Sequence, residues 1–255
     1  MIKAIKKYYE LVADRRQLGL AARLYMRIFG LPALGKYFRF RIAKRMIDPL
    51  KVKSVLDLGC GQGELSVYLG SQNIPVLSVD ISAEPLTDLA EYTKKAKLKI
   101  KTEKQNLNNL ALKKSYDLVV CLAVLDYLKD RNQFLRTCAE HTNKYFILGV
   151  PLANRRVYKP YEEIAHAKTY LTGFDEKILD RQMKKLGFVK LNSKKYLPFN
   201  LFYHFSKGTN LLSKFGLGYE KAVSLLYPSF LLITKILNIF SNRTGTEIII
   251  LYKKI

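Results

Sequence analysis

The sequence predicts an α/β fold in which helices cover both faces of a doubly wound, mostly parallel sheet. Three observations support this fold class. Short apolar runs rich in β-branched residues alternate with helical patterns between residues 52 and 151. The runs lack the polar alternation of a half-exposed strand, which is typical of parallel strands covered on both faces. At 255 residues, with 49% hydrophobic and 25% charged residues, the chain has the composition of one large folded domain with additions.

The elements follow in order along the chain. Residues 1–51 are rich in Lys and Arg, with apolar residues at helical spacing. They predict a basic N-terminal helical extension that Pro32 and Gly35 divide into two helices. The strands expected after it are 54–58, 76–80, 117–121, 145–150, 188–191 and 246–252, and the expected helices are 64–70, 85–95, 131–141 and 169–187.

An apolar and aromatic segment, residues 198–245, separates the last two expected strands. A helix from Pro228 onwards would be apolar on most of its circumference, with Lys235 at one side. Such a surface must be buried in a partner, in the domain itself or at a bilayer interface. We therefore expect an apolar helical insertion that acts as a lid, as a homodimer interface or as a membrane-surface element. No run of 18 uninterrupted apolar residues occurs, so a transmembrane helix is not expected.

A glycine-rich loop follows the first expected strand, with glycines at positions 59, 61 and 63. Residues without a Cβ let the chain turn tightly and let a ligand lie against bare backbone, and the helix N-terminus beyond favours an anionic group. Asp80 ends the second strand, where a carboxylate can accept both ribose hydroxyls. Asp57 precedes the glycines and can orient the loop or meet an ammonium group. The pattern favours a ligand with a ribose and an amino-acid end over a dinucleotide.

These residues resemble the class I S-adenosylmethionine-dependent methyltransferases. The resemblance rests on Val55-Leu-Asp-Leu-Gly-Cys-Gly-Gln-Gly, Val79-Asp-Ile-Ser, Tyr116-Asp-Leu-Val-Val-Cys-Leu and Leu186-Gly-Phe-Val. It covers roughly residues 52–189 and the final strand. It implies a seven-stranded sheet, S-adenosyl-L-methionine as cofactor and methyl transfer as the reaction. Residues 52–197 and 246–255 are thereby identified as a Rossmann-like methyltransferase domain.

The resemblance also implies roles for the residues that match. Asp80 would hold the ribose, and Leu122 would form the floor of the site. The adenine would contact Ile81, Asn106 and Leu107. The methionine end of the cofactor would lie at the loop residues Asp57, Gly59, Cys60, Gly61 and Gly63. Asn106 replaces an Asp that is commoner in the family, and its amide oxygen can still accept a hydrogen bond from the exocyclic amine. Asp126-Tyr127 stands where related enzymes often carry a Glu-His pair.

Few residues are candidates for catalysis. The sulfonium methyl is already activated, so the protein mainly aligns the nucleophile, the methyl carbon and the sulfur. A hydroxyl acceptor would benefit from a base, whereas a soft carbon or an amine would not need one. Tyr127 and His166 are the catalytic candidates near the expected mouth, with Asp126 beside them. In some relatives a His before the 169–187 helix faces the substrate, although a lone His is more often a surface or core residue.

The charge balance predicts an anionic partner. The chain has 44 Lys and Arg against 21 Asp and Glu, a net charge of +23. Each basic residue near an anionic membrane contributes about 1 kcal/mol, so the basic residues of 1–51 can hold a peripheral enzyme there. A solvated Lys-rich surface is the alternative explanation. Combined with the apolar insertion, the charge favours an amphiphilic acceptor: a lipid, an isoprenoid, or a lipid-linked or glycan precursor.

The cysteines bear on metal binding and on the cellular compartment, and three other functions compete with methyl transfer to an amphiphile. Cys60, Cys121 and Cys138 follow no metal-ligand spacing and leave one thiol unpaired, so we expect no metal and a reducing, cytoplasmic location. A nicotinamide-dependent oxidoreductase would need its third glycine one residue later. The charge would equally suit nucleic acid, so an RNA methyltransferase is the leading alternative, although no Asn-Pro-Pro-Tyr loop or Pro-Cys nucleophile follows the fourth strand. A non-catalytic, cofactor-binding scaffold subunit is the second alternative.

Overall fold

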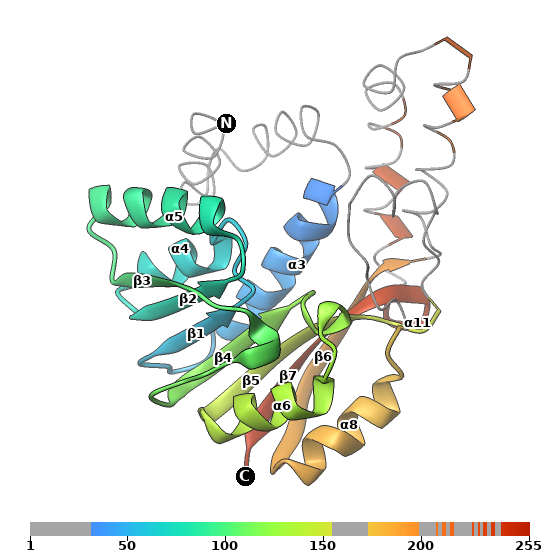
Figure 1. Ribbon diagram of the computed structural model, residues 1–255. Helices are drawn as coiled ribbons and strands as arrows, with labels where there is room; N and C mark the ends of the chain where they lie inside the picture. The colour runs from blue at the N-terminus through green and yellow to red at the C-terminus, as the bar shows by residue number, and fades with distance from the viewer. Residues whose placement is uncertain are drawn as a thin grey trace.

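The computed structural model describes residues 32–154, 173–198 and 241–255, and isolated residues between 208 and 237. Its strands are β1 (Val55–Leu58), β2 (Val76–Asp80), β3 (Ile100–Lys104), β4 (Tyr116–Leu122), β5 (Thr142–Pro151), β6 (Phe188–Pro198) and β7 (Gly245–Lys254). They form one sheet in the order β3-β2-β1-β4-β5-β7-β6 (Figure 1). The pairs among β1 to β5 are parallel, and β7 is antiparallel to both neighbours. The doubly wound, mostly parallel, seven-stranded sheet is thus confirmed.

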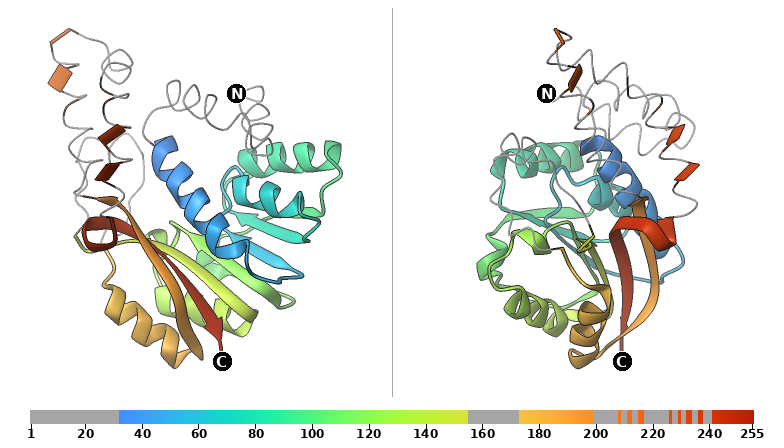
Figure 2. Two further views of the ribbon diagram at one scale, coloured as in Figure 1. Left: turned by 180° about the vertical axis from the view of Figure 1, so that it is seen from behind. Right: turned by 90° about the vertical axis from the view of Figure 1, so that its right-hand side faces the viewer.

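Helices cover both faces of this sheet (Figure 2). The helices are α3 (Pro32–Ile47), α4 (Glu64–Gly70), α5 (Ala83–Lys95), α6 (Arg131–Glu140), α8 (Glu176–Lys185) and the short α11 (Ser241–Thr244), with the 3₁₀ turns η1 (Leu107–Asn109) and η2 (Leu125–Tyr127). On one face α3 and α4 pack against side chains such as Val55, Leu118 and Ile249. On the other face α6 and α8 pack against Phe146 and Ile250. The apolar runs of the sequence are therefore buried on both sides, as expected of parallel strands.

Side-chain caps determine where α6 and α8 begin. Asp130 precedes α6 and accepts a hydrogen bond from the backbone N–H of Gln133 at 2.9 Å. Asp175 precedes α8 and accepts from Lys177 and Ile178 at 2.8 and 3.0 Å. Both carboxylates satisfy N–H groups that have no partner within the helix. The predicted 169–187 helix therefore begins later than expected in the described residues, at Glu176.

The predicted break at Gly35 is wrong, whereas a helix does begin at Pro32. α3 starts at Pro32 and runs through Gly35. A proline is tolerated at the first helical position because the N–H it lacks would have no partner there. The buried face of α3, which includes Phe40 and Met46, joins the core of the sheet. Residues 1–31 lie outside the described residues.

The predicted insertion 198–245 stays a prediction. In the structure β6 ends at Pro198 and β7 begins at Gly245. Most of the insertion lies outside the described residues, and so does His166. Within the described parts of the chain, no helix combines the length and the apolarity that crossing a bilayer requires.

A buried polar network fastens α3 to the last two strands. The Tyr196 hydroxyl donates a short hydrogen bond to Glu247 Oε2. Arg39 Nη2 lies 3.3 Å from the same oxygen, and Arg39 Nε lies 3.3 Å from the Tyr196 hydroxyl. Tyr196 is 1% exposed and Glu247 6%. Burial and the Glu247 carboxylate raise the pKa of Tyr196, so its hydroxyl stays protonated and donates.

We expect Glu247→Ala to lower the free energy of unfolding by about 3–5 kcal/mol, because it leaves the Arg39 guanidinium without its carboxylate. Tyr196→Phe should cost only about 1–2 kcal/mol, because it removes one donor and keeps the ring. Urea unfolding measures both. A double variant, Arg39→Met with Glu247→Leu, should recover much of the loss. If it unfolds as readily as Glu247→Ala, the network is not a coupled unit.

Candidate functional site

The glycine-rich loop lies at the carboxyl ends of β1 and β2. Gly59 and Cys60 donate backbone N–H groups to the carbonyl oxygen of Val79 at 2.7 and 3.1 Å, which fixes the loop to the end of β2. Gly59, Gly61 and Gly63 have φ values of 72°, 54° and 77°. Side chains disfavour this left-handed region, so the three glycines allow the turn from strand to helix.

The three glycines differ in what surrounds them. A Cβ on Gly59 would lie 2.1 Å from Val124 Cγ2, and one on Gly63 would lie 2.5 Å from Leu89 Cδ2. A Cβ on Gly61 would meet no atom within 4 Å. Gly59 and Gly63 are therefore required by packing within the protein. Gly61 exposes bare backbone to open space, as a loop that receives a ligand must.

Asp80 lies directly against this loop. Its Oδ2 accepts the backbone N–H of Gly61 at 2.8 Å, and its Oδ1 accepts that of Ser82 at 2.9 Å. The carboxylate is therefore fixed in position, and each oxygen keeps capacity for a further donor. Ile81, the next residue, is 58% exposed, so an apolar side chain stands in the open beside the carboxylate.

Asp57 is buried beneath the loop, with 4% of its surface exposed. Ser66 Oγ donates to Asp57 Oδ2 at 2.6 Å, and Ser78 Oγ donates to Ser66 Oγ at 2.8 Å. Burial raises the pKa of Asp57 to about 7, against the opposing effect of the Ser66 hydrogen bond, and the carboxylates of Glu64 and Asp80 add to the increase. The chain of hydroxyls fixes the Asp57 carboxyl in position, and its predicted role of orienting the loop stays a prediction.

This raised pKa predicts a stability that depends on pH. Folding favours the protonated carboxyl, so its contribution is complete below about pH 4 and is lost as the pH rises through 7. We expect the free energy of unfolding of the ligand-free protein to fall by about 2 kcal/mol between pH 5 and pH 8 on this account. Asp57→Asn should remove that component in urea unfolding, whereas Asp88→Asn on α5 should keep it. An identical pH profile for Asp57→Asn and wild type would refute the assignment.

The other sequence-predicted residues lie at the same edge of the sheet. Asn106 follows β3, and its Oδ1 accepts the Asn108 backbone N–H at 3.0 Å. Leu107 is 7% exposed and belongs to the core. Leu122 ends β4, and Tyr127, 47% exposed, ends η2. Asp126, beside Tyr127, is buried. The topology thus brings the loop, Asp80, Asn106, Leu122 and Tyr127 to the carboxyl ends of neighbouring strands.

Two cations near the loop were not singled out from the sequence. A recess of about 100 Å³ beside the loop is lined by Lys36 and Arg39 of α3, and by loop residues that include Asp57 and Gly61. This volume is below the roughly 300 Å³ of a small-molecule pocket, so the recess forms only part of a site. Lys36 and Arg39 are spaced one helical turn apart on α3, which was the only signal in the sequence.

The three cysteines have no catalytic role in this geometry. Cys60, Cys121 and Cys138 are free and buried. Burial raises the pKa of each thiol, so none is a thiolate at neutral pH. The described residues also bring together no group of three or more His, Cys, Asp or Glu side chains that could hold a metal ion.

Part of this chain is similar in sequence to known methyltransferases. Residues 56–144 match the family model described as "Methyltransferase domain". A ubiquinone biosynthesis O-methyltransferase of Rickettsia conorii is 26% identical over 124 residues, 43% of each chain. A probable S-adenosyl-L-methionine-dependent methyltransferase, TehB of Haemophilus influenzae, is 34% identical over 103 residues, covering 40% of this chain and 35% of TehB. The chain therefore spans less than half the length of these curated relatives.

A solved structure resembles almost the whole chain. Magnesium protoporphyrin IX methyltransferase of Synechocystis PCC 6803, solved with bound SAH, aligns with a TM-score of 0.58 at 14% sequence identity. The alignment covers 88% of this chain and 85% of that protein. At this identity the likeness concerns the fold, which it confirms beyond the matched domain.

Proposed function

We propose that this chain, which carries a methyltransferase domain with the class I S-adenosylmethionine-dependent fold, transfers a methyl group from S-adenosylmethionine to a small-molecule acceptor. The observation that carries the proposal is the contact between the open Gly61 backbone and the fixed Asp80 carboxylate. Together they offer a surface without side chains for an amino-acid end and two oxygens for ribose hydroxyls.

The residues present fit this cofactor. Asp80 would hold the ribose, and the exposed Ile81 would cover one side of the adenine. Gly59, Cys60 and Gly61 would face the methionine end, with Asp57 supporting them from below. Lys36 and Arg39 beside the loop favour the carboxylate at that end. Asn106 and Leu107 would serve the adenine edge, although the Asn106 amide oxygen is already engaged with Asn108.

The bound cofactor supplies a methyl group that is already activated, so the chain's main task is alignment. Leu122 would form the floor of the site at the end of β4. Tyr127, half-exposed at the end of η2, and His166 are the residues we propose to contact the acceptor. A proton on a hydroxyl acceptor would leave through one of these two residues or through water.

The favoured acceptor is an amphiphile. The first relatives are named ubiquinone biosynthesis O-methyltransferases, which supports a small-molecule acceptor. Among the few described residues between β6 and β7, Leu232, Ile233 and Ile236 are 61%, 47% and 51% exposed. Together with the net charge of +23, these apolar side chains support an amphiphilic acceptor at an anionic membrane surface. We propose that residues 198–245 form a lid over the acceptor, a homodimer interface or a membrane-surface element.

One experiment tests the function. The purified chain is incubated with methyl-labelled S-adenosylmethionine and a host-cell extract, and the label is partitioned into organic, RNA, protein and small-molecule fractions. Label in the organic fraction supports the amphiphilic acceptor, and label among the water-soluble small molecules supports only the broader proposal. Label in RNA would replace the proposal with an RNA methyltransferase. Binding of S-adenosylhomocysteine without any transfer would mean either that the extract lacks the acceptor or a partner, or that the chain is a non-catalytic scaffold subunit. Absence of binding would refute the proposal as a whole.

A further inference from the structure

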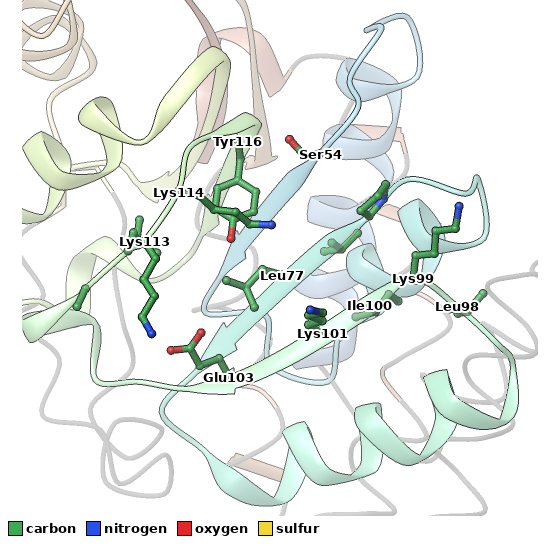
Figure 3. Close-up of a pocket in the computed structure, with 14 residues that line it drawn as sticks. Ser54, Leu77, Leu98, Lys99, Ile100, Lys101, Glu103, Lys113, Lys114 and Tyr116 are labelled. Atoms are coloured by element: carbon green, nitrogen blue, oxygen red, sulfur yellow. The ribbon is translucent and has the colours of Figure 1, made fainter.

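A groove runs along strands β2 and β3, on the sheet face that α6 and α8 also cover. The helices described on this face, α6 and α8, lie along β5 and β6. The connection from β3 to β4, residues 105–115, contains only the short turn η1. A groove of about 780 Å³ opens between this connection and strands β2 and β3 (Figure 3). Its residues Ser54, Val76, Ile100 and Tyr116 mark the amino ends of the parallel strands.

The connection 105–115 forms one wall of the groove, and hydrogen bonds hold this wall in place. The Gln105 side chain donates to the carbonyl oxygen of Ala111 and accepts its backbone N–H, both at 3.1 Å. Nε2 of His141, the residue that follows α6, lies 3.1 Å from the carbonyl oxygen of Leu112. Tyr116, at the end of this wall, is 3% exposed. The groove is therefore a built feature of the fold, of the size that small-molecule sites have.

The groove is apolar inside and cationic at its rim. Leu77, Ile100 and Leu112 are among its apolar lining residues. The charged lining residues are Lys99, Lys101, Lys113, Lys114 and Glu103, a net charge of +3. Figure 3 shows Lys113 and Glu103 at one end, Lys99 at the other and Lys114 between them beside Tyr116. None of the four lysines forms an ion pair with a carboxylate of the described residues.

We propose that this groove binds one molecule of an amphiphilic anion, a phosphate monoester on a single aliphatic chain. The lysines would hold the phosphate, and the apolar floor would bury the chain. A flat membrane surface would not fill a concave site, and nucleic acid would leave the apolar floor unused. The groove shares no lining residue with the recess beside the glycine loop, so this ligand would not be the methyl acceptor. The proposal stands or falls independently of the proposed function.

The test is calorimetric titration of the full chain with monododecyl phosphate below its micelle concentration. We expect one molecule to bind per chain. The double variant Lys101→Glu/Lys114→Glu should weaken binding by about tenfold or more, because two exposed cations are reversed. The matched control is Lys184→Glu/Lys185→Glu at the end of α8, which reverses two exposed lysines elsewhere and should change the affinity by less than about twofold. Circular dichroism melting checks that both variants remain folded.

A chain-length series tests the apolar floor. Each methylene added between octyl and dodecyl phosphate should tighten binding by about two- to fourfold. Inorganic phosphate that binds as tightly as dodecyl phosphate would overturn the proposal, because the floor would be unused. Anionic vesicles that bind through the same lysines while the monomer does not would identify a membrane-docking surface instead. Binding that the Lys101/Lys114 variant leaves unchanged would place the ligand elsewhere and would also overturn it.

Discussion

Asp80→Ala is expected to weaken the binding of S-adenosylhomocysteine by about 100-fold or more. The substitution removes the carboxylate that would accept the two ribose hydroxyls, and each charge-assisted hydrogen bond is worth about 1.5–3 kcal/mol. It also leaves the N–H groups of Gly61 and Ser82 without their acceptor, so the loop loses its fixed position. Isothermal titration calorimetry with the purified chain measures the loss directly.

Two further variants separate these effects. Asp80→Asn keeps an amide oxygen that can still accept one N–H, so its affinity should fall between wild type and Asp80→Ala. Glu91→Ala removes an exposed carboxylate from the neighbouring helix α5 and should bind like wild type. If Asp80→Ala binds within about threefold of wild type, the carboxylate serves the loop alone and the ribose lies elsewhere.

Gly59→Ala is expected to destabilise the protein by about 2–4 kcal/mol and to abolish measurable cofactor binding. The new Cβ would lie 2.1 Å from Val124 Cγ2, and the residue would hold a φ of 72° that side chains rarely adopt. Valine is stiff at its first side-chain torsion, so relief requires movement of the backbone at the end of β4 or in the loop. Urea unfolding and calorimetry measure the two losses.

Gly61→Ala is the matched control for this prediction. It carries a similar left-handed strain, with a φ of 54°, but its Cβ would meet no protein atom. It should therefore cost only about 1 kcal/mol of stability while still impairing binding, because the methyl occupies the space reserved for the ligand. Val124→Ala should partly rescue the stability of Gly59→Ala but not that of Gly61→Ala. Equal destabilisation by the two glycine variants would show that backbone strain, not the contact with Val124, sets the cost.

The fold was largely predictable because most strands are buried on both faces. β4 reads as a continuous apolar run after Asp117, and all but its last residue are buried. β3 was missed, and its pattern explains why. As the strand at the edge of the sheet, Ile100–Lys104 has partners on one side only and carries three charged residues among its five. An edge strand needs few apolar residues, so hydrophobicity gives little signal there.

Some residues of the candidate site were predictable from the sequence and others were not. The loop and Asp80 were predictable because a turn from strand to helix imposes its glycines within a few residues. The network of Arg39, Tyr196 and Glu247 was not, because its members lie 157 and 208 positions apart in the chain. The sequence places Arg39 one helical turn from Lys36, but it does not indicate Tyr196 or Glu247 as partners of Arg39. Its partners are defined only once β6 and β7 have paired.

Strand β7 lies between β5 and β6 and runs antiparallel to both. This arrangement makes the connection from β6 to β7 exchangeable. Pro198 and Gly245 are partners across the ladder, so the connection departs and returns at adjacent positions, about 5 Å apart. Its ends are also on the side of the sheet where β5 ends, since Pro151 pairs with Glu247. Loop-closure entropy grows by only about 0.6 kcal/mol for each doubling of length. Evolution, or a designer building chimaeras, can therefore exchange this segment for another of different length while every strand and the glycine loop keep their places.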